Sequence, residues 1–379
     1  MLDFLSIEYD ESIKWYSILG GAQELARRMQ STLETQPTFD SPVTAIRALN
    51  KLDVELDVGS NGKTETHKYN ALFSTVSLSS LRHISKSGAG LSSPVRQAIR
   101  TLGYTSVAKV AIKFKRAWWI HDLEAYSIKK GGSGHSDMNI RTCIYPSYNI
   151  YDSNDTTAVL LASITKEDDA RIMGSLISTN KNHTQKVAEE DALKHMVLLE
   201  LVKLHMNDEV TQEELERLIY DNYLDHHAWD WSSDPYVGGG YAHFGPQQFS
   251  TRWSQLIQPS GDVIIAGEHA SPHHGWVEGA FESVIHGLYT WMGSCLVAVP
   301  DMAKARKMLI KADPDDDDDG FKSPFVGLPP YMNTALAEWQ AAIGFLQREE
   351  HLQNIGAPGA MKMSGEDVDF EIVFVEQEE

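Results

Sequence analysis

The sequence is short of cysteine, of basic residues and of long apolar runs, and each shortage excludes a class of protein. Its two cysteines, Cys143 and Cys295, are too few for a disulfide framework or a four-thiolate metal site. Both have apolar or aromatic neighbours, so we expect two core residues in a reducing compartment. Lys and Arg number 33 against 53 Asp and Glu, a formal net charge of −20. Such a chain repels nucleic acid and anionic membranes, and we expect neither as a partner.

No segment is typical of a membrane span or a secretion signal. The most apolar stretch, residues 288–299, is interrupted by Gly293 and Ser294, and it is shorter than the roughly 20 residues that cross a bilayer. The first residues include acids where a secretion signal needs bases. We therefore expect a soluble, cytoplasmic protein. With 379 residues, 42% of them hydrophobic, the chain can form more than one globular domain.

Common nucleotide-binding, hydrolase and metal motifs are missing as well. The GKT triplet at 62–64 has Asp57 where a phosphate-binding loop needs its first glycine, and GGGYAHFG at 238–245 lacks the third glycine of a dinucleotide loop. No Gly-x-Ser-x-Gly elbow occurs. His269 and His273 have the spacing of helical metal ligands, but a proline between them disfavours a helix. We expect no metal.

The apolar patterns predict a mixed α/β fold. Alternation on either side of an Asn-Gly pair predicts a hairpin over residues 54–69, and a further strand is expected at 107–114. Helical periodicity predicts long helices over 187–206 and 276–292. Residues 263–266 are a short apolar run, typical of buried strands in parallel sheets covered by helices.

Three other segments complete the prediction, a loop, a linker and a further helix. Residues 229–249 are rich in glycine and aromatic residues without a period, which favours a packed loop. The run DPDDDDDG at 313–320 favours a solvated linker. Beyond it, residues 334–352 have the pattern of an amphipathic helix.

The most informative segment is VIIAGEHASPHHGWVEGAFES, residues 263–283. An apolar strand ends at Gly267 and Glu268, a loop follows, and a helix begins near Trp276. A helix start offers unpaired backbone N–H groups and positive potential, which suit a carboxylate, a phosphate or an anionic heteroaromatic ring. A strand-to-helix turn without any ligand explains the pattern equally well.

The same segment resembles the C-terminal flavin-binding segment of the flavin amine oxidases, especially the L-amino acid oxidases. The shared features are a strand ending in AGEH, a short loop, and GWVEGA at the start of a helix. Shorter stretches agree in the same order along residues 16–292, among them GG at 20–21, SPV at 41–43, AKV at 108–110 and DDA at 168–170. The resemblance implies a two-domain protein that uses FAD to oxidise a carbon–nitrogen bond of a small amine or amino-acid-derived substrate, with O2 as acceptor.

The resemblance also implies a domain plan, an incomplete doubly wound FAD-binding domain beside a mixed-sheet substrate domain. We expect a first FAD-binding segment at 1–80, a substrate-binding domain at 81–245 and a second FAD-binding segment at 246–293. A C-terminal extension with the acidic linker and a helix is expected at 294–379. No Gly-x-Gly-x-x-Gly segment, which binds the ADP half of FAD in the family, occurs before Gly20. We therefore expect the strand at 263–266 to expose apolar faces, and the chain to form a homo-oligomer or recruit a partner chain.

Individual residues take roles from the same resemblance. FAD would be bound by Val43, Gly267, Glu268, Gly275, Trp276 and Val277. Val43 would meet the adenine end through its backbone, Glu268 the ribityl or pyrophosphate portion, and the helix start the flavin N1 and C2 carbonyl.

Lys109 and Trp276 are the expected catalytic residues, and Lys109 matches a lysine that holds a water near flavin N5. Trp231, Gly275 and Trp276 would border the substrate.

Two departures from the family bear on the substrate. The arginine that pairs with the substrate carboxylate in L-amino acid oxidases belongs to the portion without a counterpart here. A tyrosine expected just after residues 160–162 is replaced by Ser163 or Ile164.

The alternation of residues around Lys109 places this lysine on a strand face with apolar residues, which favours a buried lysine.

Two functions therefore stay open. Retention of Glu268, Trp276 and Lys109 favours a flavin-dependent oxidase. Loss of the phosphate-binding loop favours a degenerate, non-catalytic relative that acts as a binding or scaffold partner.

Overall fold

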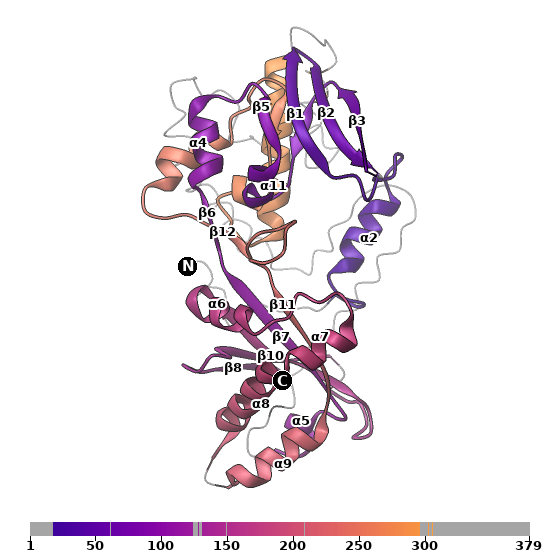
Figure 1. The fold of residues 1–379 in the computed structure, drawn as a ribbon, viewed down its shortest axis with the longest axis vertical. Helices are drawn as coiled ribbons and strands as arrows, with labels where there is room; N and C mark the ends of the chain where they lie inside the picture. Colours follow the sequence, from indigo (N-terminus) through magenta and orange to yellow (C-terminus); the bar gives the residue numbers. More distant parts are fainter. Residues whose placement is uncertain are drawn as a thin grey trace, which may run out of the picture.

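The chain folds into two lobes joined by a narrow waist (Figure 1). The computed structural model describes residues 18–60, 62–123, 128, 131–148, 150–207, 209–295, 302 and 305. The expected acidic linker and the helix at 334–352 lie outside the described residues. In the part of the chain that is described, no helix is both long and apolar enough to cross a membrane.

The larger sheet of the first lobe has the strand order β3-β2-β1-β5. Strands β1 (Val43–Asn50), β2 (Asp53–Ser60) and β3 (Lys63–Tyr69) are antiparallel neighbours, and β5 (Ser85–Gly88) runs parallel to β1. The β2–β3 hairpin confirms the prediction from alternating residues. Val54 is fully buried in the lobe's core, whereas every residue of β3 is exposed.

A second, two-stranded sheet of the first lobe pairs β4 (Leu72–Ser74) with β13 (Val263–Ile265) in parallel. Helix α11 (Val277–Cys295) covers this pair, and Ile264 packs in one cluster with Trp291. The prediction of a buried strand in a parallel sheet is confirmed. The expectation that β13 exposes apolar faces is wrong, because all three of its side chains are buried between α11 and the lobe's main core.

Short helices complete the first lobe. Pro94 lies in the first turn of α4, and the Ser92 hydroxyl accepts a hydrogen bond from the Val95 N–H, which explains why the helix begins there. The helices are α2 (Gln23–Ser31), α3 (Leu78–His83), α4 (Ser93–Thr101), the π-helix η2 (Phe249–Trp253) and α10 (Ser254–Leu256). Residues 89–102, expected in the substrate-binding domain, pack into the core of this lobe. Core packing therefore favours a boundary between the first FAD-binding segment and the substrate-binding domain near Thr105 rather than at residue 80.

The second lobe is built on an antiparallel sheet with the order β11-β7-β10-β9-β8. Helices cover one face of it, where alternate residues of β7 are buried, and the opposite face carries exposed lysines. The strands are β7 (Val107–Phe114), β8 (Gly132–His135), β9 (Thr142–Tyr145), β10 (Ala158–Lys166) and β11 (Tyr223–Asp230). The helices are α5 (Trp118–His121), α6 (Glu167–Ser175), α7 (His183–Glu189), α8 (Asp191–His205) and α9 (Gln212–Asn222). Cys143 is a free, buried core residue, as expected.

The helix expected over 187–206 is in fact two helices, because Glu190 interrupts it. The Glu190 backbone is not helical, and its fully buried carboxylate contacts His226 Nε2 at 3.0 Å and accepts a hydrogen bond from the Ser178 N–H at 2.8 Å. Strand β11 was missed, because its start precedes the stretch interpreted as a loop and its buried residues, His226 and Ala228, form no alternation of large apolar side chains.

A glycine-rich loop joins the lobes between β11 and β12 (Tyr241–His243), which pairs with β6 (Gly103–Thr105). The Ser77 hydroxyl donates to the Val237 carbonyl at 2.5 Å, so the loop is tied to the start of α3. At Gly239, with φ of +148°, an added Cβ would lie 2.4 Å from Tyr104 Cβ. The glycines at 238–240 therefore allow the backbone of the loop to approach its neighbours, such as Tyr104, closely.

We expect Gly239→Ala to lower the free energy of unfolding by about 3 kcal/mol or more, because it combines backbone strain with a clash. Gly132→Ala is the matched control: its φ is +143°, and an added Cβ meets nothing within 4 Å. The control should cost only about 1–2 kcal/mol of backbone strain. Urea unfolding of the two variants measures the difference, and equal losses would show that close approach is unimportant.

A stripe of apolar side chains along α11 stays exposed: Val277, Phe281 and Ile285 have exposed fractions of 60%, 42% and 46%. Because such a stripe favours association, we expect Phe281→Glu to shift the chain toward monomer in light scattering. Ile172→Glu on α6 is the control, since Ile172 is 49% exposed elsewhere. A wild-type protein that is already monodisperse and monomeric would contradict this expectation.

Candidate functional site

The parallel strands β4 and β13 end at the same edge of their sheet, next to the 3-10 helix η3 (Glu268–Ala270) and the start of α11. Ligands of open α/β sheets bind at this edge. Gly267 follows β13 with φ of +119°, and its N–H donates to the Ser283 hydroxyl at 2.8 Å. An added Cβ would lie 2.7 Å from His269 Cε1. The turn into the site therefore requires glycine.

Glu268 joins three segments at this edge. Its Oε1 accepts a hydrogen bond from the Ala242 N–H at 2.9 Å, and its Oε2 accepts one from the Gly275 N–H at 3.0 Å. Burial raises the pKa of Glu268 above its ordinary value, and these two donors oppose the rise. A carboxylate has about four acceptor positions, so two remain for the hydroxyl groups of a ligand.

The crowded histidines around Glu268 are packing residues. Burial lowers the pKa of His269 to about 3 and that of His274 to about 4, so both are neutral at pH 7. The His274 ring stacks on Phe249 with centroids 5.1 Å apart. Within the described residues, no three His, Cys, Asp or Glu side chains are grouped so that they could hold a metal ion.

The start of α11 is accessible. Trp276 and Val277 are 37% and 60% exposed, and Gly275 just before them has φ of +80°. The first N–H groups of this 19-residue helix carry the positive end of its dipole. The structure thus brings Gly267, Glu268, Gly275 and the helix start together.

Lys109 lies on the other side of the site, on the outer face of the second lobe's sheet. It pairs with Trp229 of β11 and with Ile164 of β10. Side chains of directly paired residues point to the same face, so an aromatic and an aliphatic side chain flank the lysine. Lys109 is exposed, and the expectation of a buried lysine is wrong because the covering helices occupy the opposite face.

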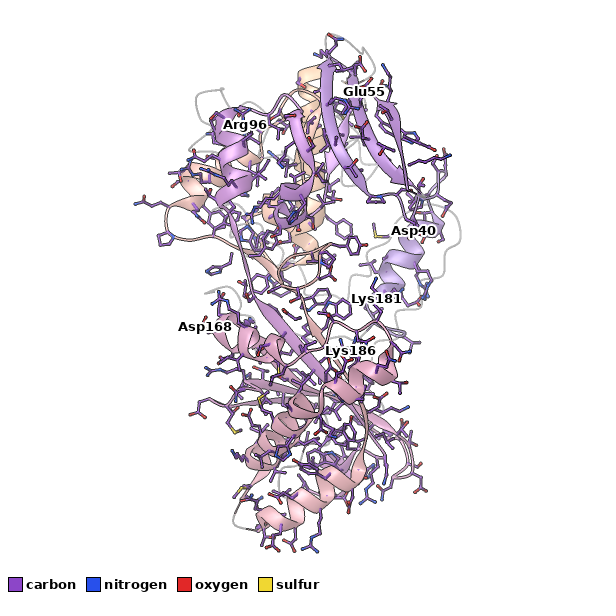
Figure 2. All side chains as sticks on the ribbon, viewed as in Figure 1. Asp40, Glu55, Arg96, Asp168, Lys181 and Lys186 are labelled. Carbon is purple, nitrogen blue, oxygen red and sulfur yellow. The ribbon has the colours of Figure 1, made fainter. Side chains whose placement is uncertain are left out.

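Two tryptophans extend this outer face toward the waist. The Trp231 N–H donates to the Val107 carbonyl at 3.0 Å, and its ring meets Trp229 edge-on at 6.1 Å between centroids. Lys186, labelled in Figure 2 near the waist, places Nζ 5.5 Å from the centroid of the Trp229 ring. Trp231 is therefore positioned beside the strand that carries Lys109.

Ser163 and Ile164, the two residues at the expected tyrosine, point to opposite faces of the sheet. Ser163 points inward, is fully buried and donates to the Ile140 carbonyl at 3.0 Å. The register of β10 shifts between Leu161 and Ser163, and Ile164 follows on the outer face. Ile164 therefore lies beside Lys109 on the outer face.

Tyr241 connects the two sides of the site, and sequence reasoning missed it. An added Cβ on Gly275 would lie 3.4 Å from Tyr241 Cγ, so the ring lies against the start of α11. Lys166 Nζ lies 5.5 Å from the centroid of the same ring. Lys166 was also missed, although it follows Ile164 by two residues on a strand, the spacing of one sheet face.

Val43 stands apart from these residues. It is the half-buried first residue of β1 and pairs with Val58. Its predicted contact with the adenine end of FAD stays a prediction.

The chain is similar to known proteins over most of its described length. A profile of the flavin-containing amine oxidoreductases matches residues 4–285. The chain is 32% identical over 294 residues to L-amino-acid oxidase 4 of Hebeloma cylindrosporum, covering 75% of this chain and 45% of that protein. It is 27% identical over 280 residues to an L-amino-acid oxidase of Siganus canaliculatus, covering 73% and 47%.

A solved structure of a redesigned putrescine oxidase shares the fold, with a TM-score of 0.54 and 16% identity over 74% of this chain and 53% of that one. The chain thus spans about half the length of these relatives. The match covers both lobes and includes the segment folded as β13, η3 and the first part of α11. The chain therefore belongs to the flavin-containing amine oxidoreductase family.

Proposed function

We propose that the chain oxidises a carbon–nitrogen bond of an amine or amino-acid-derived substrate, with FAD as cofactor and O2 as acceptor. The observation that carries this proposal is the contact through Tyr241. That ring lies against Gly275, beside Glu268 and the start of α11, and its centroid is 5.5 Å from Nζ of Lys166, on the sheet face that presents Lys109. A cofactor held beside Glu268 and the start of α11 would thus face the sheet surface that carries Lys109.

The residues that would hold FAD fit the group. Gly267 and Gly275 allow the tight turns on either side of Glu268, where an added Cβ would meet His269 and Tyr241, and Glu268 has acceptor positions left for ribityl or ribose hydroxyls. Trp276 and Val277 begin α11, and Val43 would contact the adenine end. When bound, FAD would take a hydride from the carbon next to nitrogen and pass two electrons to O2, giving an imine and hydrogen peroxide.

The chain's own groups would assist this chemistry in three ways. The start of α11 stabilises negative charge that develops near Trp276 and Val277. The Lys109 ammonium donates a hydrogen bond to a water molecule in front of the sheet. Trp231 and Ile164 provide apolar walls that limit the access of bulk water.

Flavin content tests the cofactor. We expect purified protein, or protein titrated with FAD, to show oxidised-flavin absorbance in the visible region. Glu268→Gln should retain less flavin, because its single amide oxygen can accept from only one of the Ala242 and Gly275 N–H groups and its NH2 would oppose the other. Glu213→Gln, on the exposed surface of α9, is the control. A protein that stays colourless after FAD titration would favour the scaffold interpretation.

Lys109 can be tested on protein that retains flavin. We expect Lys109→Met to lower peroxide release about 10²-fold, the range found for positioned proton-transfer groups, with visible absorbance unchanged. Lys113→Met removes the next lysine on the same face and should have little effect. If both variants keep wild-type peroxide release, Lys109 has no catalytic role.

A further inference from the structure

We propose that Lys186 is a positioning residue, whose ammonium is held by Glu190 and fixes the indole of Trp229 beside Lys109. This inference rests on the proposed function, because it takes the sheet face that carries Lys109 as the side where the reaction occurs. Lys186 acts through Trp229 and is not itself a catalytic residue. Neither the motifs nor the resemblance pointed to Lys186 or Glu190.

Lys186 is a buried lysine of α7, with an exposed fraction of 8%. Its Nζ donates a hydrogen bond to the Ala228 carbonyl at 2.8 Å and lies 3.7 Å from Glu190 Oε1. Strand β11 lies at the edge of its sheet, so this lysine satisfies a backbone carbonyl on an edge strand. The ammonium is therefore fixed between a helix and the strand that carries Trp229.

Glu190 is itself fixed by contacts on both of its oxygens. Oε1 accepts the Ser178 N–H at 2.8 Å, and Oε2 contacts His226 Nε2 at 3.0 Å. The Tyr223 hydroxyl contacts the other ring nitrogen of His226 at 2.7 Å. Burial lowers the pKa of His226 below its ordinary value, so the ring is neutral at pH 7. The cation in contact with Glu190 is therefore Lys186.

Trp229 is the side chain that this lysine reaches on the outer face. Lys186 Nζ lies 5.5 Å from the centroid of the indole, a separation at which a cation attracts an aromatic ring. The ring also stacks on His227, with centroids 5.9 Å apart. Because Trp229 is 39% exposed, surrounding side chains leave part of the ring unconfined. Trp229 pairs directly with Lys109, so a displaced indole would change the space beside Lys109.

The charge of Lys186 is what distinguishes positioning from simple packing. A buried ion pair is costly to desolvate, and apolar residues of similar volume often hold a fold equally well. Methionine at position 186 would fill the same space, but it would neither bond the Ala228 carbonyl nor attract the Trp229 ring. Removal of Lys186 alone would leave Glu190 buried and unpaired, which is strongly destabilising. The informative variant therefore removes both charges, as Lys186→Met with Glu190→Gln.

Fluorine NMR of protein labelled with fluorotryptophan reports on the ring without turnover. The Trp229 signal is identified by its loss in Trp229→Leu. We expect Lys186→Met/Glu190→Gln to shift or broaden this signal while those of the core residues Trp118 and Trp119 stay in place. Lys181→Met is the control, because Lys181 is an exposed lysine just before α7, labelled in Figure 2 near Lys186.

Turnover of protein that retains flavin tests the consequence for the reaction. We expect Lys186→Met/Glu190→Gln to lower kcat/KM for peroxide release about tenfold, because the wall beside Lys109 is displaced, with flavin absorbance unchanged. In a Trp229→Leu background the same pair of substitutions should cause a further loss below about twofold, because the ring through which they act is gone.

An unchanged Trp229 signal, or equal displacement of all tryptophan signals, would overturn the proposal. Turnover that stays at the wild-type level, or losses that add fully in the Trp229→Leu background, would overturn it as well. Absence of flavin and of turnover in the wild type overturns the oxidase instead, whereas the Trp229 signal still tests whether Lys186 fixes the ring.

Discussion

The carboxylate of Glu268 is the constraint on which the site depends. By accepting the N–H groups of Ala242 and Gly275, it fixes β12 against the start of α11. The Tyr241 ring, next to Ala242, is thereby set against Gly275 and within reach of Lys166. A half-buried acid with two backbone donors and spare acceptor positions both orders these segments and offers a binding group.

The fold supports this arrangement from both lobes. In the first lobe, α11 and the β4–β13 pair bury each other and direct the turn at Gly267 toward the site. In the second, helices cover one face of the sheet and leave the face with Lys109 open toward the site. The glycine-rich loop around Gly239 passes close to Tyr104 and holds the lobes at the waist.

Sequence patterns predicted the helices and strands that are determined by residues close together in the sequence. The β2–β3 hairpin, β7, β13 and α11 follow from alternation, apolar runs and helical periodicity. The break at Glu190 could not be predicted, because its cause is a contact with His226, 36 residues away along the chain. The exposure of Lys109 depends on which sheet face the helices cover. Lys166 and Tyr241 come from segments far apart in sequence, and only the fold shows that they meet.

Amide hydrogen exchange, measured with and without FAD, tests the central claim most directly, because it reports on both sides of the site at once. The account predicts that FAD slows exchange in the turn from Gly267 to Val277 and in β12, where Glu268 is hydrogen-bonded. It also predicts slower exchange in the part of β7 around Lys109. Unchanged exchange in all three segments, or protection confined to other parts of the chain, would contradict it.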